Sequence, residues 1–226
     1  MIRVQGVHAV LTDIEGTTGS IAFVKDTLFP YARERLARFV AAHPQETAPI
    51  LDAVRREAGS DLADRQAVEV LLAWMDEDRK ATPLKTLQGL IWREGYESGR
   101  LVGHVYDDAA RGLRRWAAAG LKLYVYSSGS VEAQKLIFHH SRLGDLTPLF
   151  SGYFDTATGP KTAPASYLAI AEAIGLKPVE IAFLTDSEAE LSAACGAGFI
   201  VNRLARDGRP GPGTATSFDE IQIEPG

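Results

Sequence analysis

Four short runs of apolar residues lie along the chain, and polar residues follow each of them at once. They cover residues 7–12 (VHAVLT), 121–126 (LKLYVY), 149–156 (LFSGYFDT, the weakest) and 181–185 (IAFLT). Their β-branched and aromatic residues favour strands. Because their apolar residues are continuous and do not alternate with polar ones, they indicate a sheet that is covered on both faces.

Helical patterns alternate with these strands. The first predicted helix covers residues 107–119 and stops at Gly120. The second covers residues 130–140, with Ser130 as a candidate N-cap. The third covers residues 164–174, with Pro164 at its start and Gly175 just past its end. Pro at a helix start and Gly just past its end are typical helix boundaries. The order strand, helix, strand predicts an α/β fold with a doubly wound, mostly parallel sheet.

One interval is too long for a single crossover between strands. More than a hundred residues separate the first two strands, and their periodicity predicts helices over about 26–42, 48–58, 62–80 and 84–98. We therefore predict a core domain of residues 1–20 and 101–226 with a helical cap inserted at 21–100. Residues 207–217 (DGRPGPGTATS) are expected to form a loop before a final short strand, FDEIQI.

Composition excludes several classes of protein. The 226 residues carry a net charge of −5 and no basic stretch that would suit a general nucleic-acid binder. No apolar run reaches the ~18 residues of a membrane span, and the N-terminal sequence lacks the pattern of a signal peptide. The single cysteine, Cys195, cannot form an internal disulfide. We expect a cytoplasmic, monomeric protein that binds neither nucleic acid nor a membrane.

Polar side chains that suit one chemistry follow all four strands. These are Asp13 and Glu15 after the first strand, Ser127 and Ser128 after the second, Lys161 after the third and Asp186 after the fourth. Because ligands of parallel α/β sheets bind at the carboxyl ends of the strands, we expect these groups to converge. Three acids, hydroxyl groups and one lysine predict phosphoryl transfer that depends on Mg²⁺ and acts on a small phosphate ester.

Each group has a chemical reason to be there. Mg²⁺ prefers oxygen ligands, which carboxylates on separate strands supply. Asp13 could attack phosphorus and form an aspartyl phosphate, while Glu15 serves the leaving group or the attacking water. A serine hydroxyl, Lys161 and the backbone amides of Gly16 and Thr17 are expected to hold the phosphoryl oxygens. Three carboxylates in one cleft would raise one another's pKa without a compensating cation.

The order of these motifs resembles the haloacid dehalogenase superfamily of aspartate-nucleophile phosphotransferases. DIEGT (13–17) is similar to its first motif, D-x-D-G-T, and the strand-end Ser127, Lys161 and Asp186 match the other three. Glu15 departs from the usual second aspartate. Members often carry two adjacent acids at the fourth motif, whereas Ser187 follows Asp186 here, so the roles of Glu188 and Glu190 stay open.

Longer segments resemble the enolase-phosphatases of methionine salvage, also called acireductone synthases. They are DIEGTTGSIAFVKDTLFPYA, KTLQGLIW, YSSGSVEAQKLIF, FDT, GPK and FLTD, and the similarity runs from about residue 8 to 190. The resemblance implies conversion of 2,3-diketo-5-methylthiopentyl 1-phosphate to acireductone and phosphate. By matching position it implies that Asp13, Glu15 and Asp186 bind Mg²⁺ and that Ser127, Ser128 and Lys161 contact substrate.

Three alternatives remain to be separated from this hypothesis. A phosphatase of another small phosphate ester shares every core motif. A serine hydrolase built on YSSGS is disfavoured, because Val125 stands where G-x-S-x-G needs its first glycine. A non-catalytic phosphate-binding module would not need all the acids. The base that enolises the diketone is not identified; Glu15 is one candidate and a residue of the insertion another. Gln88 and Trp92 could help to close the cap, although helix packing is the favoured role.

Overall fold

The computed structural model describes residues 1–206, 208, 211 and 213–226. The chain divides into two compact units, one of Met1–Ile21 with Val102–Gly226 and the other of Ala22–Leu101. The predicted domain boundaries, after residues 20 and 100, lie one residue from these. None of the described helices is long and apolar enough to cross a membrane.

The first unit is built on a parallel sheet, as predicted. Within the described residues, its six strands lie in the order β4-β3-β2-β5-β6-β7, and every pair of neighbours is parallel. The strands are β2 (Ala9–Thr12), β3 (Lys122–Tyr126), β4 (Phe150–Phe154), β5 (Ile181–Thr185), β6 (Ile200–Leu204) and β7 (Thr214–Ala215). The two central strands, β2 and β5, are wholly buried, because helices cover both faces of the sheet.

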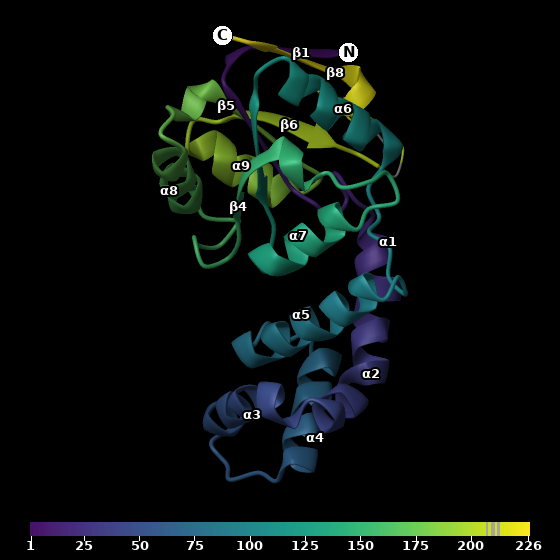
Figure 1. The fold of residues 1–226 in the computed structure, drawn as a ribbon. Helices are drawn as coiled ribbons and strands as arrows, with labels where there is room; N and C mark the ends of the chain where they lie inside the picture. The colour runs from purple at the N-terminus through teal and green to yellow at the C-terminus, as the bar shows by residue number, and fades with distance from the viewer. Residues whose placement is uncertain (207, 209–210, 212) are drawn as a thin grey trace. The chain divides into compact units, whose positions relative to one another are not determined.

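Helices flank the sheet in the first unit (Figure 1). They are α6 (Asp107–Ala118), α7 (Val131–His139), α8 (Pro164–Ile174) and α9 (Glu188–Gly196). Helices α8 and α9 pack on β2 and β5 through a core that includes Leu11, Tyr167, Ile170 and Phe183. Helix α6 contacts β3 and α7 contacts β4. Helices α6, α7 and α8 therefore lie where the sequence pattern predicted them, whereas α9 was not predicted.

Two strands form a separate small sheet. Strand β1 (Ile2–Val7) pairs in parallel with β8 (Ile221–Pro225), so the two terminal segments of the chain lie side by side (Figure 1). The predicted last strand, FDEIQI, is strand only from Ile221, because Phe218–Glu220 forms a 3-10 helix, η4. Of the predicted loop over 207–217, residues 207, 209, 210 and 212 lie outside the described residues, and Thr214–Ala215 is β7.

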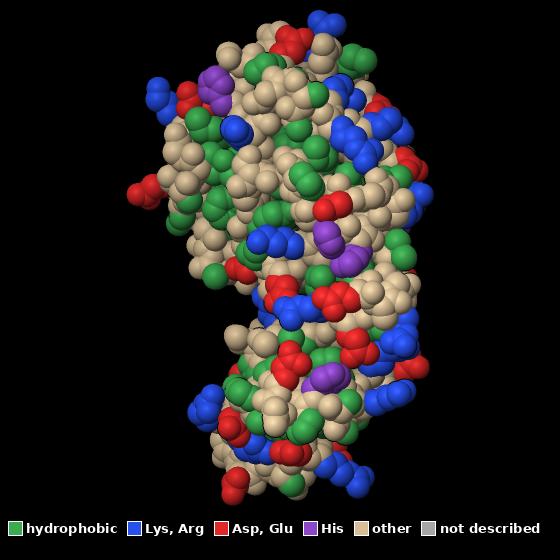
Figure 2. Space-filling view, in the orientation of Figure 1, with side chains coloured by type: hydrophobic (Ala, Val, Ile, Leu, Met, Phe, Trp, Pro, Cys, Tyr) green, Lys and Arg blue, Asp and Glu red, His purple; other side chains and the backbone are tan. Residues whose placement is uncertain are grey.

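The second unit is helical. Its helices are the short α1 (Ile21–Phe23), which begins in the first unit, a π-helix η1 (Val24–Leu28), α2 (Phe29–Ala42), α3 (Pro44–Ala58), α4 (Asp64–Asp76) and α5 (Thr82–Glu97). Each of α2 to α5 buries an apolar stripe, with Leu36, Leu51, Leu71 and Leu87 almost fully enclosed. On the face in Figure 2, acidic and basic side chains are interspersed over both units.

Candidate functional site

Asp13 lies directly beyond the carboxyl end of β2. Its backbone amide donates to the Leu184 carbonyl at 2.9 Å and so continues the pairing of β2 with β5. The carboxylate is 4% exposed, and its Oδ1 atom accepts a hydrogen bond from the amide of Ile14 at 2.8 Å. The central strands therefore fix the backbone of this residue, and a local hydrogen bond orients its side chain.

The turn after Asp13 closes on itself. The amide of Gly16 donates to the Gly19 carbonyl at 2.9 Å, and the amides of Thr17 and Gly19 both donate to the Ile14 carbonyl. Gly16 has a φ of +69°, a left-handed conformation that favours glycine. The expectation that the amides of Gly16 and Thr17 hold phosphoryl oxygens is therefore wrong, because both donate within the turn.

Lys161 connects two carboxylates of the site. Its Nζ atom lies 2.7 Å from Asp13 Oδ1 and 2.9 Å from Glu190 Oε2, and its side chain is 9% exposed. The Tyr167 hydroxyl donates to the Lys161 carbonyl at 2.7 Å, and the Tyr126 hydroxyl donates to the Gly159 carbonyl at 2.9 Å. Buried aromatic residues therefore hold the loop that carries the ammonium group.

Glu15 and Ser127 meet across the ends of β2 and β3. The Ser127 hydroxyl contacts both carboxylate oxygens of Glu15, at 3.1 and 3.3 Å, and accepts from the amide of Gly129 at 3.1 Å. Gln134 of α7 supports the same loop through a 2.8 Å hydrogen bond to the Gly129 carbonyl. Ser128 follows Ser127 and is exposed. The structure thus pairs Glu15 with a serine that the sequence analysis assigned to substrate.

Asp186 follows β5 and lies against the Asp13 turn. A Cβ atom at position 16 would overlap the Asp186 carboxylate, so only glycine leaves it room there. Since β2 and β5 are neighbours, Asp13 and Asp186 lie at the same sheet edge. Five of the six predicted residues thus lie in one contiguous region, and Ser128 is next in sequence to one of them.

The pKa values reflect this concentration of acids. Burial, and then the charge of Asp13, raises the pKa of Glu15 to about 7. The same two causes raise the pKa of Asp186 and of Glu190 above their ordinary values. Burial alone would lower the pKa of Lys161, but Asp13 and Glu190 raise it. Lys161 therefore stays charged and compensates only part of the negative charge.

Thr185 was not among the predicted site residues, and the roles of Glu188 and Glu190 were left open. Thr185, the last residue of β5, donates to Glu190 Oε2 at 2.9 Å and lies 3.3 Å from Asp13 Oδ2. Glu190 binds Lys161, whereas Glu188 forms an exposed ion pair with Arg203. The position of Thr185 next to Asp186 was the available signal for it. The choice between the two glutamates depends on which side of α9 faces Lys161.

Two residues of the helical unit were also left open. The indole of Trp92 donates to the Leu28 carbonyl at 2.8 Å, and Gln88, one turn earlier on α5, is 6% exposed. The Trp92 contact joins α5 to the end of η1. Packing within the helical unit accounts for Trp92.

The acids suit a divalent cation bound with help from other ligands. Among the described residues, no group of three or more His, Cys, Asp or Glu side chains is arranged to hold a metal ion by itself. Asp13 and Asp186 nevertheless offer carboxylate oxygens at one sheet edge, where burial, and then the charge of Asp13, raises the pKa of Asp186. Mg²⁺ commonly takes one or two carboxylates and completes its shell with water and phosphate oxygens. The residues present fit such a cation.

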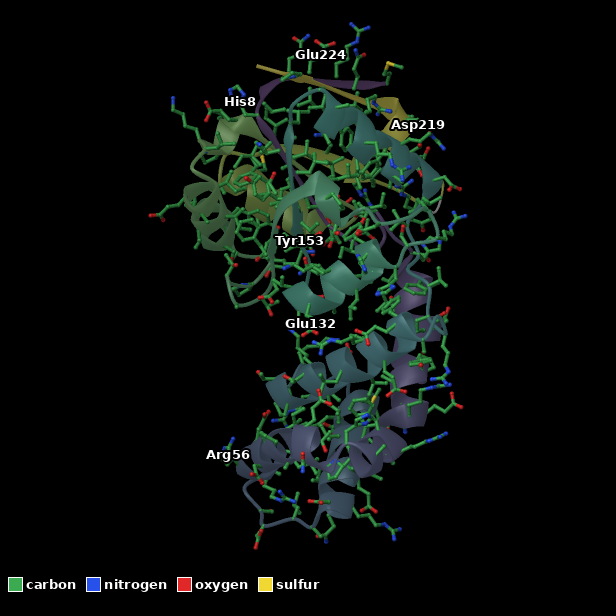
Figure 3. All side chains as sticks on the ribbon, viewed as in Figure 1. His8, Arg56, Glu132, Tyr153, Asp219 and Glu224 are labelled. Carbon is green, nitrogen blue, oxygen red and sulfur yellow. The ribbon has the colours of Figure 1, made fainter. Side chains whose placement is uncertain are left out.

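A surface groove lies elsewhere on the first unit. It has a volume of about 690 Å³ between α7 and the edge strand β4, and Glu132 and Tyr153 line it (Figure 3). None of the six predicted site residues lines this groove. Its size alone therefore does not make it the functional site.

Comparisons with known proteins identify a family and relatives that this chain resembles. The family model for haloacid dehalogenase-like hydrolases matches residues 7–198. Enolase-phosphatase E1 of Azotobacter vinelandii is 55% identical over 222 residues, covering 97% of this chain and 98% of that protein. Enolase-phosphatase E1 of Pseudomonas aeruginosa strain UCBPP-PA14 is 56% identical over 223 residues, covering 96% and 99%.

A solved structure is similar over the same length. The crystal structure of the UTR4 protein from Saccharomyces cerevisiae superimposes with a TM-score of 0.79 at 34% identity. The match covers 96% of this chain and 97% of that chain. The similarity therefore includes both units of the chain.

Proposed function

Because the chain belongs to the haloacid dehalogenase-like hydrolase family, and within it to the enolase-phosphatase E1 proteins, we propose that it is an acireductone synthase of methionine salvage. It converts 2,3-diketo-5-methylthiopentyl 1-phosphate to acireductone and inorganic phosphate. The observation that carries this proposal is the identity of 54–57% with enolase-phosphatases over most of the chain. The buried ion pair of Asp13 and Lys161 at the sheet edge supports the proposal, because it provides a nucleophile and a positive charge for the phosphoryl group.

Asp13 is the proposed nucleophile. A carboxylate oxygen attacks phosphorus, the bond from phosphorus to the substrate oxygen breaks, and an aspartyl phosphate forms. Water then attacks the phosphorus, the acyl phosphate bond breaks, and Asp13 is restored as phosphate leaves. Hydrogen bonds from Ile14 and Lys161 fix the carboxylate before the reaction, which reduces the cost of orienting it.

Glu15 is the proposed acid and base of these two steps. Its pKa of about 7 allows it to give a proton to the leaving oxygen and to take one from the attacking water. The hydrogen bond with Ser127 holds the carboxyl group beside Asp13. Ser127, Ser128 and Lys161 are proposed to contact the phosphoryl group.

Mg²⁺ is the proposed cofactor, and Asp13, Asp186 and Glu15 are its proposed ligands. When bound, it supplies positive charge that neutralises the phosphate and stabilises an enolate. The carboxylates of Asp13 and Asp186, which follow the neighbouring strands β2 and β5, support this choice. The Glu15 carboxylate contacts Ser127, so its part in the metal shell depends on its backbone or on a rotation of its side chain.

The enolase step precedes the phosphatase step in this proposal. A base removes the α proton, the electron pair forms the carbon–carbon double bond, and the carbonyl oxygen takes a proton. Glu15 is one candidate for this base, and a residue of the helical unit is another. We propose that this unit, inserted directly after the Asp13 turn, is the cap of the enzyme and that the protein acts as a cytoplasmic monomer.

Asp13→Asn tests the nucleophile. Phosphate release with Mg²⁺ should fall by at least about 10³-fold, because an amide cannot attack phosphorus. Enol formation, followed by ultraviolet absorbance, should survive in part. Asp155→Asn is the matched control, since Asp155 instead accepts from the amides of Val131 and Ala157. Undiminished phosphate release from Asp13→Asn would overturn the assignment.

A panel of phosphate esters tests the substrate. The diketone phosphate should give an enol before phosphate appears, and simple esters should give phosphate without any enol. A preference for another small ester, by kcat/KM, would favour the alternative of a phosphatase with a different substrate. Full activity in EDTA would contradict the proposed metal.

A further inference from the structure

The Asp13 turn is held from outside by two groups, which donate three hydrogen bonds to neighbouring carbonyl groups of the turn. The guanidinium of Arg206 donates to the Thr17 carbonyl, from Nη2 at 2.6 Å and from Nε at 3.0 Å. The amide of Tyr106 donates to the Thr18 carbonyl at 2.9 Å. Hydrogen bonds from a charged group are stronger than those between neutral groups. Arg206 therefore provides the stronger of the two anchors.

Arg206 is itself fixed in place. Its Nη1 atom forms an ion pair with Asp108 at 2.6 Å, in which the two side chains are only 11% and 14% exposed. The guanidinium also lies 4.3 Å from the ring centre of Tyr106 and 5.2 Å from that of Phe218. These cation–π contacts, together with the several hydrogen bonds of its planar guanidinium, restrict the conformations that the Arg206 side chain can adopt.

Asp108 is anchored in turn. Its carboxylate accepts hydrogen bonds from the amide of Phe218 at 2.7 Å and the hydroxyl of Ser217 at 3.0 Å. Burial acts to raise the pKa of Asp108, but these donors and Arg206 together lower it, so the carboxylate is charged at neutral pH. A chain of contacts thus runs from η4 through Asp108 and Arg206 to the backbone of the turn.

The position of this turn matters for the proposed reaction. It begins at Asp13, and the Thr18 hydroxyl donates back to the Asp13 carbonyl at 3.0 Å. Gly16, in the same turn, lies against Asp186. A movement of the backbone at Thr17 would therefore displace the carboxylates of Asp13 and Asp186. A displacement of about 1 Å in a reacting group can cost on the order of 100-fold in rate.

We propose that Arg206 is a positioning residue, which holds the Asp13 turn in its reactive geometry through the Thr17 carbonyl. The proposal rests on the proposed function, since it assumes that Asp13 reacts with phosphorus. Arg206 lies beyond residues 7–198, the segment that the family model matches. It also follows no recognisable catalytic motif in the sequence.

Arg206→Met tests the proposal, and Arg115→Met is its matched control. Arg115 donates to the carbonyls of Phe218 and Ile221, at 3.1 and 3.2 Å, and lies 3.9 Å from Asp219, so it anchors the same C-terminal segment without contacting the turn. We expect Arg206→Met to lower kcat by about 10- to 100-fold with KM changed by less than about threefold. Arg115→Met should keep both constants within about twofold of wild type.

Two further measurements do not depend on this variant folding well. Arg206→Lys keeps the charge, but its single nitrogen cannot contact Asp108 and the Thr17 carbonyl as the separate nitrogens of the guanidinium do. Its kcat should therefore lie between those of wild type and Arg206→Met. Millimolar propylguanidine should restore part of the activity of Arg206→Ala in a saturable way and leave Arg115→Ala unchanged. The thermal unfolding midpoint of each variant shows whether the variant is folded at the temperature of the assay.

Binding of beryllium trifluoride with Mg²⁺, an acyl phosphate mimic on aspartate, reports the geometry without turnover. Arg206→Met should bind it about tenfold more weakly, by calorimetry, than wild type and Arg115→Met do. The proposal is overturned if Arg206→Met matches wild type in kcat and in this affinity. Equal losses in Arg206→Met and Arg115→Met would also overturn it, since they would indicate a general effect of loosening the C-terminal segment.

Failure of the proposed function would look different. A wild-type protein that cleaves p-nitrophenyl phosphate but not the diketone phosphate overturns the proposed substrate, and the kcat ratio on that ester still decides the role of Arg206. A wild-type protein that cleaves no phosphate ester and binds no beryllium trifluoride overturns both proposals.

Discussion

Glu190 gives Lys161 its second carboxylate partner and shares that oxygen with the Thr185 hydroxyl. Glu188, two residues earlier on the same helix, forms an exposed ion pair with Arg203 instead. At the scale of single residues, the sequence could show that acids follow β5. It could not show which of them reaches the lysine, because that depends on how α9 sits on the sheet.

Glu190→Gln should therefore lower kcat by about tenfold, because Lys161 loses a charged partner and its contact with Asp13 becomes less constrained. Glu188→Gln, the matched control, should stay within about twofold of wild type, since exposed ion pairs contribute little. Steady-state kinetics of both variants on the same substrate measures the contrast. Similar activities of the two variants would contradict a role for Glu190 at the site.

In the protein without a bound metal ion, Glu15 lowers the free energy of unfolding as the pH rises. Its pKa is 4.5 in the reference state and about 7 in the folded state, so the folded protein binds the proton more tightly and loses stability as the pH rises between these values. In EDTA, Glu15→Gln should be more stable than wild type by about 1–3 kcal/mol near pH 8, and the difference should shrink toward pH 4.5. Urea unfolding at a series of pH values measures it. A difference that is constant with pH would contradict the buried, repelled carboxylate.

At the scale of elements, the pattern of apolar residues located a fully buried central strand and a helix that packs one side on the sheet. Strand β5 has the predicted bounds, Ile181–Thr185, and α8 has the predicted bounds, Pro164–Ile174. Strand β1 was missed because only two of its six residues are buried, and β6 because Asn202 and Arg203 interrupt its apolar run. The contact of Arg206 with the Asp13 turn joins residues 189 positions apart, and no local pattern encodes it.

Helix α5 contains two interior glycines whose surroundings differ. A Cβ atom at Gly89 would meet no other atom within 4 Å, whereas one at Gly95 would lie 2.7 Å from Leu101 and 2.8 Å from the ring of Tyr31. Gly89→Ala should stabilise the protein by about 0.5–1 kcal/mol through helix propensity. Gly95→Ala should destabilise it by about 1–3 kcal/mol, because the tyrosine ring must shift. Urea unfolding compares the two, and changes of the same sign would contradict this account.

At the scale of the whole molecule, the chain consists of two compact units, and the proposed metal ligands all belong to the unit that contains the parallel sheet. The long interval between the first two predicted strands already indicated a separate helical unit. The tryptophans are distributed between the units: Trp74 and Trp92 are buried in the helical unit, and Trp116 is buried against Phe218 in the other. Fluorescence can therefore follow each unit separately.

Mg²⁺ should stabilise the sheet-containing unit more than the helical one, because a ligand stabilises the folded state that binds it. At ten times the dissociation constant, the gain is about 1.4 kcal/mol. In urea unfolding, the midpoint of Trp74→Phe/Trp92→Phe, which retains Trp116, should rise with Mg²⁺ more than the midpoint of Trp116→Phe. Adding Asp186→Asn to the first variant should remove the rise. Equal rises in both variants would contradict independent stabilisation of the units, and no rise in either would contradict the proposed metal site.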